Sequence, residues 1–134
     1  MSGNNAPNAV AQPPFPNVHV EFNGRVKCHV ATFSLAAGTP TLITTASTAG
    51  VSVSTPGAGR IAIAFPAPGT GAIGWASPCP NITAGAPATD VTYAIRGDTT
   101  NFATGAVEVD TMTAATPTNA TAASVTVLIY VFGP

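Results

Sequence analysis

Charged side chains are scarce in this chain. Lysine, arginine, aspartate and glutamate make up 7% of its 134 residues, against about 25% in an average soluble domain. The formal net charge is only -1 at pH 7. A free monomer with so few charges and almost no net charge tends to associate. We therefore expect part of its surface to be covered by other copies of the chain or by a larger assembly.

The shortage of basic residues excludes two kinds of partner. The cations of the chain are Arg25, Lys27, Arg60 and Arg96. A nucleic acid backbone or an anionic membrane requires a denser basic patch than this.

The longest apolar run, residues 127–132, is far shorter than the roughly 18 residues of a spanning helix. Residues 1–12 also lack the basic and apolar regions of a secretory signal, so we expect no signal peptide.

Known catalytic and metal-binding motifs are missing as well. The chain has no nucleophile elbow, no zinc-protease motif and no phosphate-binding loop. Cys28 and Cys79 could pair, but two cysteines do not make a disulfide framework. We expect both to be free, buried thiols. His19 and His29 should lie on one face of a hairpin and Cys28 on the other, which argues against a shared metal site.

The acidic residues cluster in the second half of the chain. Glu108 and Asp110 should share one face of a strand, and Asp98 lies in a turn sequence, with Asp90 upstream. Such groups could in principle hold calcium or form the carboxylate pair of a glycosidase, but their spacing is typical of neither. We expect a solvated face and a polar turn. The sequence therefore predicts no enzyme activity, no metal and no cofactor.

Strand signals dominate what is present. Strong helix formers other than alanine are rare, and glycine and proline occur 13 times each. Apolar residues alternate with small or polar ones, most clearly at residues 60–65 and 105–110, as in half-buried strands. We predict strands at residues 18–22, 25–34, 41–45, 50–54, 60–65, 72–76, 90–96, 105–112 and 123–132. This pattern predicts an all-β protein, an antiparallel β-sandwich of jelly-roll type.

The last predicted strand differs from the others. Beyond Thr126 it is apolar on both faces, so it should be a central strand covered on both sides or packed at a subunit interface. Val127, Ile129 and Val131 are accordingly predicted to lie in an oligomer interface or in the buried core. Together with the low charge, this strand predicts self-association, and we expect a trimer.

The first predicted hairpin surrounds Asn23-Gly24. A two-residue loop would pair Val20 with Lys27 and mix apolar and charged groups on one face. A three-residue loop, with Gly24 in a left-handed bulge, pairs Val20 with Val26 instead. A one-residue slip moves every side chain to the other face, so the hydrophobic pattern favours the three-residue loop.

Residues 1–17 differ in composition from the rest of the chain. They are rich in asparagine, alanine and proline and carry no alternating pattern. The segment ends on Pro13, Pro14, Phe15 and Pro16. Proline biases a chain to extended geometry. We predict an extended N-terminal arm that binds a partner through these four residues, the alternative being a disordered tail, and a β-sandwich domain over residues 18–134.

Three further features have both a structural and a functional interpretation. Trp75 is the only tryptophan, and a single tryptophan in a strand is more often a core residue than a ligand-binding one. We expect Trp75 in the core. The irregular stretches at residues 77–89 and 113–122 are either assembly-forming loops or variable surface loops.

The layout of residues 30–134 resembles a known class of domains. Residues 51–65, containing Gly57-Ala58-Gly59-Arg60, lead into a proline- and glycine-rich turn, and strands at 93–97, 106–110 and 125–132 follow. This arrangement is similar to the β-sandwich domains of bacteriophage virion proteins, which occur in capsid decoration proteins and at fibre tips. Animal C1q-like jelly rolls share the architecture, but their aromatic signature is missing here.

The resemblance implies a function for the chain. It implies a non-enzymatic structural protein, made in the host cytoplasm and located in the virion. Such a decoration or cement protein would bind and stabilise the capsid surface as a homotrimer, with the major capsid protein as its partner. The alternative is a receptor- or glycan-binding fibre-tip module. A hydrolase is the third hypothesis and has the least support, because no catalytic spacing is present.

Overall fold

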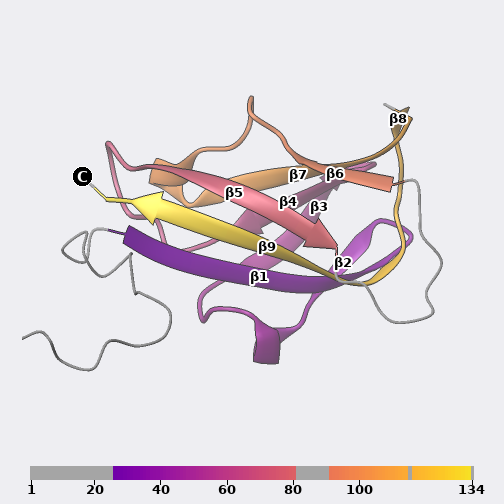
Figure 1. Cartoon of the computed structure of the whole chain (residues 1–134), viewed down its shortest axis with the longest axis horizontal. Coiled ribbons are helices and arrows are strands. Elements are labelled where there is room, and N and C mark those ends of the chain that lie inside the picture. The colour runs from indigo at the N-terminus through magenta and orange to yellow at the C-terminus, as the bar shows by residue number, and fades with distance from the viewer. Residues whose placement is uncertain (1–25, 81–90, 115, 134) are drawn as a thin grey trace, which may run out of the picture.

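The chain folds into two antiparallel sheets that face each other (Figure 1). A computed structural model describes residues 26–80, 91–114 and 116–133. The predicted arm at 1–17, with Pro13, Pro14, Phe15 and Pro16, and the strand at 18–22 with its hairpin lie outside these residues. The described part confirms the predicted all-β sandwich: its helical content is limited to two 3-10 turns, at Thr44–Ala46 and Phe102–Thr104.

The two sheets have nested connections. The four-stranded sheet has the order β2 (Thr39–Leu42), β1 (Val26–Ala36), β9 (Ala122–Phe132) and β5 (Ile73–Pro80). The second sheet has the order β3 (Ser52–Gly57), β4 (Arg60–Ala64), β7 (Ala106–Thr113) and β6 (Val91–Ile95), with β8 (Thr116–Pro117) paired to β7. The outermost strands of the chain, β1 and β9, pair in one sheet, and β4 pairs with β7 in the other. This nesting is jelly-roll-like.

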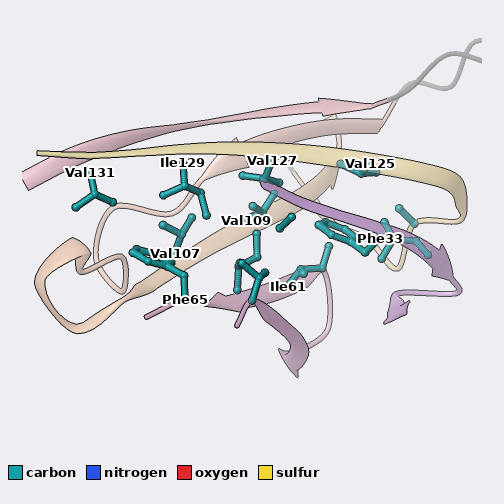
Figure 2. Packing of buried hydrophobic residues seen from close by; sticks show 14 of the residues in the cluster. Phe33, Ile61, Phe65, Val107, Val109, Val125, Val127, Ile129 and Val131 are labelled. Atoms are coloured by element: carbon teal, nitrogen blue, oxygen red, sulfur yellow. The ribbon is translucent and has the colours of Figure 1, made fainter. Parts of the chain in front are cut away.

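Alternating side chains of both sheets build the core. Ile61 pairs with Val109 and Ile63 with Val107, and all four are at most 1% exposed. Figure 2 shows the side chains of β9 pointing from the upper sheet towards these residues. The alternation that predicted strands at 60–65 and 105–112 is therefore also what fills the space between the sheets.

The final strand is central, as its apolar sequence predicted. It pairs with β1 along one side and with β5 along the other. Val127, Ile129 and Val131 are 0%, 0% and 2% exposed and point into the sandwich (Figure 2). These three residues therefore belong to the core of the protomer. The other face of the same strand, which carries Leu128 and Tyr130, is only half-buried.

Three predicted strands have clearly shifted ends, one of them the strand expected at 50–54, which runs over Ser52–Gly57. The strand expected at 41–45 lies at Thr39–Leu42 and is followed by a 3-10 turn, and the strand expected at 72–76 continues to Pro80. Pro78 and Pro80 suggested a loop, but β5 is an edge strand of its sheet. A proline is tolerated there because its missing N–H lies on the side without a partner strand.

Candidate functional site

Two arginines and three carboxylates of the described residues form ion pairs on the five-stranded sheet, whereas Lys27 is exposed on β1 of the other sheet. Arg60 on β4 bonds to Glu108 on β7 at 2.6 Å. Arg96, just after β6, contacts Asp98 at 2.8 Å and Asp110 at 3.4 Å. Hydrogen bonds that Arg96 donates to Asp98 and, secondarily, to Asp110 raise the pKa of Arg96. As predicted, Glu108 and Asp110 share a strand face, which is opposite to buried Val107 and Val109.

The potential metal ligands do not converge. Cys28 and Cys79 are free, but both are exposed, so the prediction of buried thiols was wrong. They lie on β1 and β5, with β9 between them, and are offset by four residues along the strands. That separation is roughly 16 Å, far beyond the ~7 Å Cα limit of a disulfide. Within the described ranges, no three His, Cys, Asp or Glu side chains are close enough to hold a metal.

His29 is the buried titratable group on the inner face of β1. It is 9% exposed, and its ring centre lies 5.0 Å from that of Phe65. Its Nδ1 atom is buried and has no hydrogen-bond partner among the described residues. Burial, and secondarily the charge of Lys27, lowers the pKa of His29 below its ordinary value of 6.5. An isolated, neutral imidazole in an apolar layer is a packing residue with a latent sensitivity to acid.

Trp75 lies on the surface, so the expectation of a core residue was wrong. Its side chain is 49% exposed and stacks on Tyr130, with ring centres 4.6 Å apart and planes at 25°. The phase of β5 explains this placement. Gly74 points inward, where a built Cβ would overlap the Tyr130 carbonyl and touch the ring of Phe102. Because the Tyr130 carbonyl and the Phe102 ring occupy this space, only a glycine fits on the inner side, and the bulky Ile73 and Trp75 face outward.

Trp75 belongs to a continuous apolar surface on the four-stranded sheet. The pairing register places its members in three rows across β1, β9 and β5. We call this surface the outer apolar face; it comprises Val26, Phe132 and Ile73 in the first row, Cys28, Tyr130 and Trp75 in the second, and Val30, Leu128 and Ser77 in the third. Ile73 is 68% exposed, the most exposed large apolar residue described. None of the nine residues is charged.

The two outer surfaces of the sandwich therefore differ in chemistry. The ion pairs of Arg60, Glu108, Arg96 and Asp110 lie on the five-stranded sheet, and the outer apolar face lies on the four-stranded one. A solvated surface normally mixes charged and apolar groups, and a contiguous apolar patch marks an interaction site. The outer apolar face is the candidate functional site of the described residues.

The sequence analysis located this site only in part. The apolar stretch after Thr126 indicated two covered faces, and its inner residues Val127, Ile129 and Val131 were singled out. Leu128 and Tyr130, on the outer side of the same strand, were not singled out, and neither was Ile73. For Ile73 and Trp75 the sequence held no sufficient signal, because the inward phase of Gly74 follows from the packing around it in the folded chain.

Comparisons with protein-family models, with curated proteins and with solved structures found no match to this chain. The described residues contain no helix of the length and apolarity that crossing a membrane requires.

Proposed function

We propose that this protein is a non-enzymatic structural protein of a virus particle, a decoration or cement protein that binds and stabilises the capsid surface. One observation carries the proposal: an uncharged, apolar outer face on one sheet, opposite a sheet whose charges are paired. A contiguous apolar patch rimmed by polar residues is typical of an interaction site. The partners in this proposal are two further copies, forming a homotrimer, and the major capsid protein.

The chemistry of the sandwich suits such a role. The carboxylates that could act as acids or bases are held in ion pairs, as Glu108 is by Arg60 and Asp110 by Arg96. The core is closed, with Phe33, Val109 and Val125 all at 0% exposure. A rigid, weakly charged domain adds buried area where shell subunits meet. In this proposal, residues 13–16 of the N-terminal arm provide the attachment to the shell.

Binding to shells tests the proposal directly. Purified protein is mixed with empty, mature capsids of the virus that encodes it, and the bound fraction is measured by cosedimentation. We expect saturable binding at micromolar protein and a higher melting temperature of the shell. Absence of binding at these concentrations would remove the capsid role.

A receptor- or glycan-binding tip is the second candidate, favoured by the exposed Trp75 stacked on Tyr130. Aromatic side chains pack against sugar rings, but specificity also requires polar groups at fixed positions. The polar members of the outer apolar face are few, Ser77 and the Tyr130 hydroxyl among them. Binding on a glycan array that is lost in Trp75→Ala would favour this candidate over the first.

A further inference from the structure

We propose that the outer apolar face is the contact between copies of this chain. The proposal deepens the structural role given above and rests on its homotrimer, although it does not require a capsid. It assigns the association to a surface centred on Tyr130, Trp75 and Ile73. Val127, Ile129 and Val131 of β9, predicted to lie either in an oligomer interface or in the buried core, are in the core of each protomer.

The edge strands of the four-stranded sheet are β2 and β5, and two segments along its rim are protected against strand addition. On the free side of β1, residues 43–48 cover the backbone: the Thr48 amide donates to the Val30 carbonyl and the Ile43 amide to the Thr32 carbonyl. The other edge is β5, whose Pro78 and Pro80 lack N–H donors. An edge protected in this way does not pair with another sheet. These segments leave less of the rim for pairing, and the proposal assigns association to the face of the sheet.

A second copy matches the chemistry of the face. The nine residues carry no charge, so two such faces meet without like-charge repulsion and without burying an ion. The opposite sheet is a poor alternative, because covering Arg60–Glu108 and Arg96–Asp110 would remove paired charges from water at a desolvation cost. A neighbouring copy can thus cover the uncharged face without burying an ion from it, and the paired charges remain in solvent.

The size of the face determines the kind of assembly. The outer apolar face spans three rows of residues on three strands, which corresponds to an area of about 300 Å². A pair joined by this face alone would bury roughly 600 Å², about half of the ~1,200 Å² at the lower end of stable interfaces. In a closed ring of three the contacts are heterologous, so each copy buries the face and a second surface against its two neighbours, and the total area buried per copy increases. We therefore infer a trimer that forms around this face, rather than a tight dimer.

Substitution on the face separates association from folding. Ile73→Lys adds a charge at the most exposed member of the face, so it should leave the fold intact. Ser54→Lys is the matched control: Ser54 is exposed on β3 of the other sheet. By sedimentation velocity of the full chain at high micromolar concentration, we expect a trimer for the wild type and for Ser54→Lys, and a monomer for Ile73→Lys with an unchanged far-UV spectrum.

A second measurement uses the unsubstituted face. In a Cys79→Ser background, Cys28 lies in the central row and is the remaining cysteine of the chain. Its rate of maleimide labelling should fall at least fivefold between dilute and concentrated protein. A monomeric wild type, or a trimer that persists in Ile73→Lys with Cys28 equally reactive at all concentrations, would overturn the inference. If the protein forms the trimer but does not bind capsids, only the proposed function is contradicted. If it binds capsids as a monomer, only this inference is contradicted.

Discussion

Two isoleucines on opposite sides of the four-stranded sheet allow a matched test of the fold. Ile129 is 0% exposed between the sheets, and Ile73 is 68% exposed on the outer apolar face. Truncation to alanine removes the same atoms at both sites. At Ile129 the three lost carbon groups cost about 2.4 kcal/mol in transfer free energy. The cavity left in a closed core increases this to about 3–4 kcal/mol. At Ile73 the cost should be about 0.5 kcal/mol or less, as for exposed substitutions in general.

Urea unfolding of the two variants measures both values. The transitions are followed by far-UV circular dichroism at low micromolar protein, where association does not contribute. We expect a large fall in the midpoint for Ile129→Ala, little change for Ile73→Ala, and the wild-type slope in both, since the surface exposed on unfolding is nearly the same. Equal losses at the two sites, or a greater loss at Ile73, would refute the assigned faces of β9 and β5.

Three further predictions concern acid, a turn and the arm. The pKa of His29 is lowered in the fold, so the unfolded chain binds the proton more readily below pH 6.5. The contribution of His29 to the free energy of unfolding should therefore be fully present above pH 6.5 and decline as the pH falls below that value. Urea titrations in which His29→Gln shows the same decline would contradict this. Gly105 has φ +76 and a built Cβ would overlap the Phe65 carbonyl, so Gly105→Ala should lower stability by about 2 kcal/mol. Gly97→Ala, which meets open space, should change little, and equal melting temperatures for the two would disprove the constraint. Deletion of residues 1–17, or Phe15→Ala, should weaken partner binding and leave the melting temperature of the domain nearly unchanged; early melting with normal binding would make the arm part of the fold.

Local alternation was sufficient to predict the sandwich. Ile61 and Ile63 alternate with small residues, and the same alternation buries them against Val107 and Val109. The placement of Trp75 was not predictable in this way, because it depends on tertiary packing. Phe102, distant in sequence, occupies the interior beside Gly74 and forces the opposite phase on β5. The same limit explains the cysteines, whose exposure follows from the faces of β1 and β5 and not from their chemistry.

The prolines of β5 illustrate a second limit. Pro78 and Pro80 are local loop signals, yet they occupy an edge strand whose free side needs no donor. The pairing of all strands in the sheet decides whether a given strand lies at an edge, and local sequence signals do not reveal that position. The boundaries predicted from local signals therefore failed where sheet topology overrode them.

The emission of Trp75 tests the central claim most directly, because this residue is the single tryptophan of the chain and lies on the outer apolar face. If that face is covered by other copies, the emission maximum should shift to longer wavelength on dilution, and acrylamide should quench it more strongly. The changes should follow the loss of trimer seen by sedimentation. An emission maximum and a quenching constant that stay constant while the trimer dissociates would show that the copies meet elsewhere.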